Sequence, residues 1–232
     1  MAGVGPTNNK FVFRYQYALC EIGSQVLRKL FDSIVGPDFK TYLDTSSSSI
    51  RKHFLFLLNS NKITPSQQKL LPPSEPKPKS IHFDITLLSC LLRNVCGLRR
   101  HDDVVWINPP AASDTSLEAN IVRLRVLRNE LMHNTSVFMS EADLTSNWSK
   151  LSKVLHDLNP SIGGIRNLSS LINDAKSMEI DENLIAFHSD MIKAWREMER
   201  LLDHGISEVL EVLEDQDRLR TLVEEGLEKL FF

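Results

Sequence analysis

The sequence contains few cysteines, and their placement argues against disulfide and metal frameworks. The 232 residues include only Cys20, Cys90 and Cys96, all within apolar segments. Cys90 and Cys96 do not form a C-x-x-C pair, and no histidine lies near them at metal-ligand spacing. An odd number of cysteines in apolar surroundings is typical of reduced core thiols in cytosolic proteins. We therefore expect a cytoplasmic protein without a metal site.

Long apolar runs and the common catalytic signatures are also missing. The longest apolar run, Phe54 to Leu58, is far too short to span a bilayer, and the first ten residues lack a signal-peptide pattern. No serine has a histidine at a recognisable triad spacing, and no glycine-rich loop is present to cradle a phosphate. The net charge of -3 gives no global attraction to nucleic acid. We expect no membrane contact and no cofactor, and any nucleic-acid site must be local.

Patterns typical of helices fill almost the whole chain, and no stretch has a convincing strand pattern. Apolar residues at three-to-four spacing predict one helix from about Phe11 to Ile34, ended by the glycine and proline that follow. Residues typical of N-caps predict further helices that begin after Thr64, Asp84 and Ser140. Two more are predicted at 50–58 and from Thr115 or Ser116 onward. The predicted fold class is all-α, a helical bundle.

Loops and breaks divide the chain into two predicted regions. Residues 71–80 carry four prolines and read as an exposed loop, and residues 99–114 form a long polar loop of a kind that is often functional. The NPSIGG stretch at 159–164 predicts a boundary between a helical domain at 11–158 and a C-terminal helical extension at 165–232. Within the extension, apolar residues from Leu184 to Leu201 follow coiled-coil spacing, which suits either internal packing or contact with a protein partner.

The helix that begins near Ser116 carries an arginine inside its apolar arc. At about 100° per residue, Arg128 falls among the leucines and isoleucine that should face the core: Leu117, Ile121, Leu124, Leu127 and Leu131. A row of polar residues runs beside that arc, consisting of Glu118, Arg125, Asn129 and His133. Arginine is rarely buried without a partner, because an unpaired guanidinium out of water is costly.

Two explanations fit this arrangement. In the structural one, Arg128 pairs with a carboxylate or caps another helix, and His133 meets the negative end of its own helix dipole. In the chemical one, Arg128 presents its fork to a phosphate, His133 transfers protons near neutral pH, and Asn129 orients either. RNA supplies its own 2′-hydroxyl nucleophile, so cleavage needs few further groups. Arg128 and His133 diverge by about 140° on one helix, and a two-fold dimer would solve this by bringing two copies together.

The motif Arg128-Asn129-x-x-x-His133, near the end of a helix, resembles the R-polar-x3-H motif of HEPN domains. Four longer stretches, at 17–32, 83–98, 106–130 and 140–155, are similar to the HEPN subgroup named after the DAZ-interacting, RNA-binding RING ubiquitin ligase. The resemblance covers about residues 11–158. It implies a helical bundle that dimerises through the Arg128–His133 helix, and in many HEPN domains a metal-independent endoribonuclease.

Carried over to this sequence, the resemblance assigns Arg128 to the scissile phosphate, His133 to proton transfer or phosphate contact, and Asn129 to their support. Arg125 and Glu118 on the same helix are accessory substrate-binding candidates. Arg100 belongs to a small basic spot, Arg99 to His101, that could contact a nucleotide together with Trp106. The alternative function is a catalytically silent interaction module of an immune or ubiquitin-signalling protein, with the C-terminal helices mediating assembly.

Overall fold

The computed structural model describes residues 7–59, 63–73, 79–98, 104–107, 109–133 and 140–180. In these ranges the chain forms helices joined by turns, without a strand, which confirms the all-α prediction. Among the described residues, no helix combines the length and the apolar character needed to cross a membrane.

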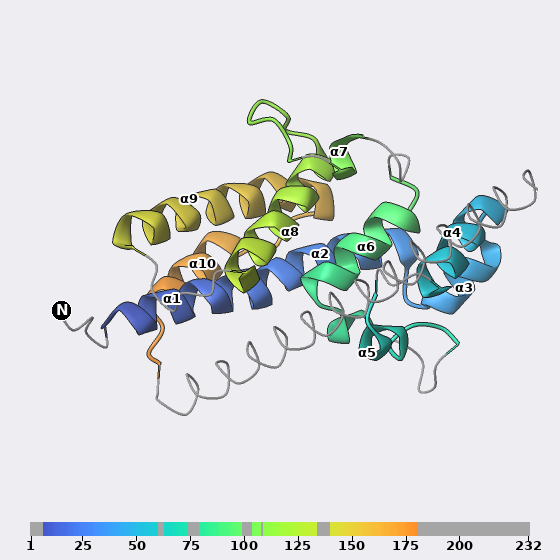
Figure 1. Ribbon diagram of the computed structural model, residues 1–232, viewed down its shortest axis with the longest axis horizontal. Coiled ribbons are helices and arrows are strands. Elements are labelled where there is room, and N and C mark those ends of the chain that lie inside the picture. Colours follow the sequence, from blue (N-terminus) through green and yellow to red (C-terminus); the bar gives the residue numbers. More distant parts are fainter. Residues whose placement is uncertain are drawn as a thin grey trace, which may run out of the picture. The chain divides into compact units, whose positions relative to one another are not determined.

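The first predicted helix is present, is slightly longer than expected and contains one wider turn. Helix α1 (Thr7–Tyr17), the π-helical turn η1 (Ala18–Ile22) and α2 (Gly23–Val35) follow one another as one continuous rod (Figure 1). Gly36 ends the rod with a φ of 76°, a left-handed value that glycine adopts freely. The π turn holds an extra residue, so it rotates the apolar face of α2 relative to that of α1.

The next helices begin largely where the sequence predicted. Helix α4 (Ser48–Asn59) contains the predicted 50–58 segment, and α5 (Pro65–Gln68) begins with a complete capping box between Thr64 and Gln67. After the short η2 (Ser80–His82), Asp84 caps α6 (Ile85–Asn94) by accepting a hydrogen bond from the Leu87 N–H. Helix α3 (Phe39–Thr45), capped by Asp38, was not predicted.

The second half of the domain contains α7 (Val104–Ile107), α8 (Leu117–His133), α9 (Glu141–Leu158), η3 (Asn159–Ile162) and α10 (Leu168–Ser177). The caps at Ser116 and Ser140 confirm two predicted starts. The prediction of a continuous loop at 99–114 is wrong at α7. That turn is held by burial of Trp106 against the core, which loop composition does not reveal.

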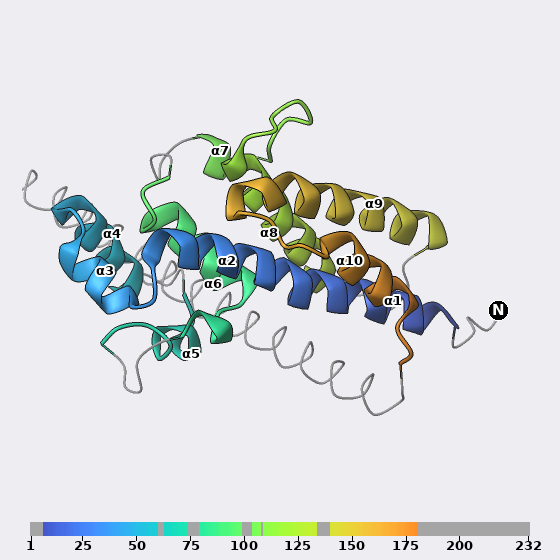
Figure 2. The same cartoon turned by 180° about the vertical axis from the view of Figure 1, so that it is seen from behind.

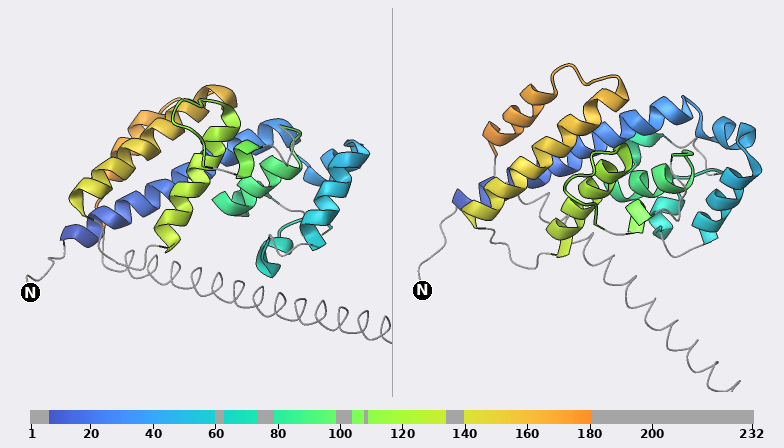
Figure 3. Two further views of the ribbon diagram at one scale, coloured as in Figure 1. Left: turned by 45° about the horizontal axis from the view of Figure 1, so that its top comes forward. Right: turned by 90° about the horizontal axis from the view of Figure 1, so that it is seen from above.

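Helix α8 lies at the centre of the packing. It is placed between α9 and α6 (Figure 3), and it also contacts α7 and η1. Where α2 begins, Gly23 brings the backbone close to both α6 and α8. A Cβ atom at that position would lie 3.2 Å from Ile85 Cδ1 and 3.4 Å from Leu124 Cδ1. The side chains of α6 and α8 therefore meet the backbone of α2 at a position that suits only a small residue.

Helix α10 packs alongside α1 (Figure 2), with Leu168, Ile172 and Ala175 buried in the common core. A hydrogen bond adds to this contact between α1 and α10. Arg14 Nε on α1 donates to the carbonyl oxygen of Met178, directly after α10, at 3.0 Å. The division of the chain into a domain at 11–158 and an extension at 165–232 stays a prediction. The coiled-coil spacing from Leu184 to Leu201 lies outside the described residues.

Candidate functional site around helix α8

The apolar arc predicted for α8 faces the core. Ile121 and Leu124 have no exposed surface, and Leu127 and Leu131 are buried beside them. Arg128 lies in the same arc and is only 9% exposed, so this arginine is placed among core residues rather than on the surface. Between residues 117 and 131, Glu130 is the one exposed side chain. The site is therefore built on a helix that its neighbours largely enclose.

The motif brings Arg128 and Asn129 together. Arg128 Nη1 donates a hydrogen bond to Asn129 Oδ1 at 3.3 Å, a long bond that orients the two side chains toward each other. The Arg128 guanidinium also affects the pKa of Cys20, which lies in the π turn η1. Burial raises the pKa of the Cys20 thiol to about 12, and the positive charge of Arg128 acts in the opposite direction. Arg128 thus lies within electrostatic reach of η1.

The raised pKa predicts that Cys20 is chemically inert in the folded protein. The thiolate is the reactive form, and a pKa of about 12 in place of the usual 9.0 lowers its population at pH 8 about a thousandfold. Burial also raises the pKa of the Cys96 thiol. We expect iodoacetamide to label both residues far more slowly at pH 8 in the native protein than in urea, as measured by peptide mass spectrometry. Equal labelling rates of Cys20 in the two states would contradict its burial.

Arg125 links helix α8 to helix α7. Its Nη2 donates to the Trp106 carbonyl oxygen at 3.2 Å, so the side chain holds α7 against α8. Burial lowers the pKa of Arg125, and repulsion from Arg93 on α6 adds to the effect. The guanidinium stays charged, because arginine keeps its proton in proteins. Arg93, which no sequence motif singled out, thus adds positive charge beside Arg125.

Of the other predicted site residues, the structure describes the side chain of Glu118, which lies away from Arg128. Glu118 lies in the first turn of α8 and is partly exposed, ten residues and about 15 Å along the axis from Arg128. His133 is the last residue of α8, and its side chain lies outside the described residues. Arg100 lies outside them as well. The structure therefore brings together Arg128 and Asn129, and separates both from Glu118.

Comparison with known proteins identifies the family. The family described as DZIP3/hRUL138-like HEPN matches residues 40–187, more than half of the chain. The chain belongs to this HEPN family. The match begins within α3 and includes α8 and α10, so it starts later and ends later than the resemblance seen in the sequence.

Two relatives carry the same domain within much longer chains. The human E3 ubiquitin-protein ligase DZIP3 is 27% identical over 155 residues, which cover 63% of this chain. The mouse protein of the same name is 29% identical over 157 residues, with the same coverage. Each match spans only 12% of the ligase's own length. No solved structure matches the chain.

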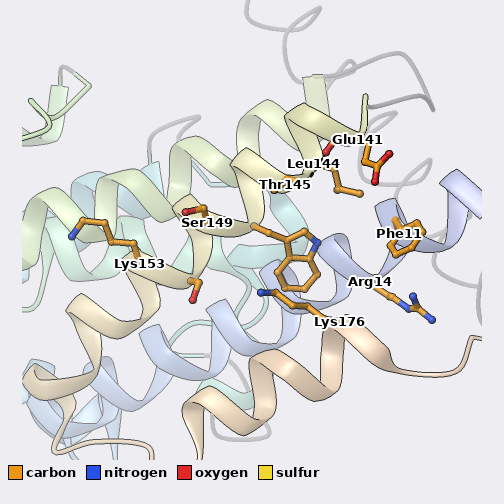
Figure 4. Close-up of a pocket in the computed structure, with 10 residues that line it drawn as sticks. Phe11, Arg14, Glu141, Leu144, Thr145, Ser149, Lys153 and Lys176 are labelled. Carbon is orange, nitrogen blue, oxygen red and sulfur yellow. Dashed lines mark hydrogen bonds between the residues drawn. The ribbon is translucent and has the colours of Figure 1, made fainter.

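A second feature of this HEPN domain has no counterpart in the sequence motifs. A pocket of about 920 Å³ lies along α9, bordered by α1 and α10 (Figure 4). Its lining includes none of Arg128, Asn129 or His133. The sequence has no signal for it, because the pocket is formed by side chains from distant parts of the chain, with Phe11 on α1 and Lys176 on α10 being 165 residues apart.

Proposed function

We propose that this HEPN domain binds single-stranded RNA and cleaves it without a metal ion, acting as a dimer. The observation that carries the proposal is the Arg128–Asn129 pair, joined by a 3.3 Å hydrogen bond one and a half turns before the end of α8, where His133 follows. A guanidinium oriented by a neighbouring amide is suited to a phosphate, since its planar fork matches two phosphate oxygens.

In the proposed reaction the 2′-hydroxyl oxygen of the RNA attacks the adjacent phosphorus, and the bond from phosphorus to the 5′-oxygen breaks. Arg128 stabilises the negative charge that develops on the phosphoryl oxygens. His133 moves the proton, either from the 2′-hydroxyl or to the leaving 5′-oxygen. The products are a 2′,3′-cyclic phosphate and a 5′-hydroxyl. Arg125, with Arg93 beside it, supplies positive charge for neighbouring phosphates.

A dimer would bring together the two side chains, Arg128 and His133, that a single copy of α8 holds apart. Arg128 and His133 point about 140° apart on α8, so one copy does not aim both at the same phosphate. Within the described part of α8, Glu130 in the C-terminal half of the helix is exposed, and we place the contact with a second copy at this turn. Two such turns related by a two-fold axis would combine the arginine of one copy with the histidine of the other.

The test is incubation of the purified protein with labelled single-stranded RNA in EDTA, beside Arg128→Ala and His133→Ala. Wild type is expected to produce cyclic phosphate ends, and each variant to lose at least about a hundredfold in rate, as is usual when a charge-stabilising or proton-transferring group is removed. Arg123→Ala is the matched control. Its guanidinium lies on the same helix but bonds to Asn120 and to the Ala111 carbonyl, away from the motif. Mixing the two inactive variants should restore activity in heterodimers.

A second candidate function is favoured by the burial of Arg128. Because only 9% of this residue is exposed, its side chain is suited to holding α8 against η1, as in a catalytically silent interaction module. The ligase relatives, in which the matched region is 12% of a long chain, suit a module of ubiquitin signalling. Absence of cleavage by wild type, combined with a lower melting temperature of Arg128→Ala, would favour this candidate over the nuclease.

A further inference from the structure

The pocket beside α9 has the form of a groove that one more helix would fill. Seven residues of α9 line it at the spacing of one continuous helical stripe, from Glu141 to Lys153. This stripe is about 18 Å long at 1.5 Å per residue. Phe11 and Arg14 on α1 and Lys176 on α10 are among the side chains that border this pocket (Figure 4). At about 920 Å³, the pocket is near the upper end of the roughly 300–1,000 Å³ typical of ligand pockets.

The floor of the groove is apolar and one of its walls is an exposed aromatic ring. Leu144 and Trp148 form buried parts of the lining, whereas Phe11 at the rim is 45% exposed, unusually high for a phenylalanine. An exposed ring that borders an apolar floor is the arrangement with which grooves receive the apolar side chains of an amphipathic helix. Burial of that ring by a partner would remove its apolar surface from water.

The rim of the groove is positively charged. Arg14, Lys153 and Lys176 line it against the single acidic residue Glu141. Lys153 also pairs with Asp157 at 2.6 Å, and that exposed pair leaves the lysine accessible to a second carboxylate. A partner with acidic residues on both sides of an apolar stripe would therefore match this groove in charge as well as in polarity.

The aromatic rings are not arranged for nucleic acid. Base binding to single strands relies on open aromatic faces. Lys176 Nζ lies 5.3 Å above the centre of the Trp148 ring, and Tyr15 packs edge-on against the same ring with the centroids 5.7 Å apart. The Arg14 guanidinium lies 5.4 Å from the centre of the Phe11 ring. Cations therefore occupy ring faces on which bases would otherwise stack.

From the apolar floor, the exposed Phe11 and the cationic rim, we propose that the groove between α9, α1 and α10 binds an acidic amphipathic helix of a protein partner. The helix spans about three turns, places its apolar side chains against Leu144 and the exposed Phe11 ring, and directs carboxylates toward Arg14, Lys153 and Lys176. This interaction is separate from the RNA site, because the groove contains no residue of the Arg128–His133 motif.

The experiment uses the full chain and a fluorescein-labelled, 14-residue synthetic peptide with leucines at helical spacing and glutamates elsewhere, followed by fluorescence anisotropy. Phe11→Ser and Lys176→Glu are each expected to weaken binding about tenfold, the effect of one lost apolar or charged contact. The matched controls are Leu55→Ser, which removes an exposed apolar side chain from α4, and Lys150→Glu, which reverses an exposed charge of α9 outside the groove. Circular dichroism melting of each variant verifies that it is folded.

Binding of the acidic peptide that depends on Phe11 and Lys176, but not on Leu55 and Lys150, would support the proposal. A peptide with lysines in place of the glutamates, and a scrambled peptide of the same composition, should bind at least tenfold more weakly. Equal binding of the scrambled peptide, displacement of the peptide by single-stranded RNA, or no binding to the full chain would each overturn it. RNA cleavage by Lys176→Glu is expected to equal that of wild type, so failure of one proposal is distinguishable from failure of the other.

Discussion

Replacement of Leu124 by alanine is expected to lower the free energy of unfolding by about 2–5 kcal/mol, the cost of a large-to-small change in a packed core. Leu124 has no exposed surface, and its two methyl groups reach the start of α2 beside Gly23. Because α8 is enclosed by α9, α6, α7 and η1, the surrounding helices have little freedom to close the cavity. Urea denaturation followed by circular dichroism measures the loss.

The matched control for this variant is Leu55→Ala, the same substitution in another helix. Leu55 is 56% exposed on α4, so its removal should change the free energy of unfolding by less than about 0.5 kcal/mol. Similar losses for the two leucines would mean that α8 is not the centre of the core.

Replacement of Gly23 by leucine is expected to destabilise the protein by about 1–3 kcal/mol, the usual cost of overpacking. Even a Cβ atom at this position would lie 3.2 Å from Ile85 Cδ1, which is closer than ordinary van der Waals contact. A leucine adds three further carbons to the junction of α2, α6 and α8. The melting temperature and the urea midpoint should both fall.

Two further variants separate overpacking from a loss of helix stability. Gly23→Ala should be nearly neutral, because its gain of up to about 1 kcal/mol in helix propensity offsets a clash that the flexible Ile85 side chain relieves. The double variant Gly23→Leu with Leu124→Ala should be more stable than the sum of the single changes, since the new side chain fills the space left by the old one. Strict additivity would show that the two residues do not meet.

Local patterns were sufficient to predict most helices and the buried face of α8. The caps at Thr64, Asp84, Ser116 and Ser140 are hydrogen bonds within three residues, and three-to-four spacing identifies the face that leaves water. The Arg128-Asn129-x-x-x-His133 motif, with the longer stretches around it, was sufficient to suggest the HEPN family. The family match confirmed this suggestion.

Features that depend on distant contacts were not predictable in this way. Helix α7 is held by burial of Trp106 and by Arg125, nineteen residues later in the chain. The π turn lies within an otherwise regular apolar pattern, so spacing predicted one uniform helix. The wheel placed Arg125 in a row with Asn129, but a wheel shows direction around one helix and not which neighbour lies there.

Local sequence patterns are enough to establish that the protein is all-α, where most helices begin, and that Arg128 belongs to the apolar arc of its helix. Those properties follow from interactions within a few residues. The folded chain adds that Arg128 is buried next to η1, that Arg125 holds α7, and that α1, α9 and α10 border a groove. Each of these depends on side chains brought together from distant parts of the chain, such as Arg14 and Met178, which are 164 residues apart.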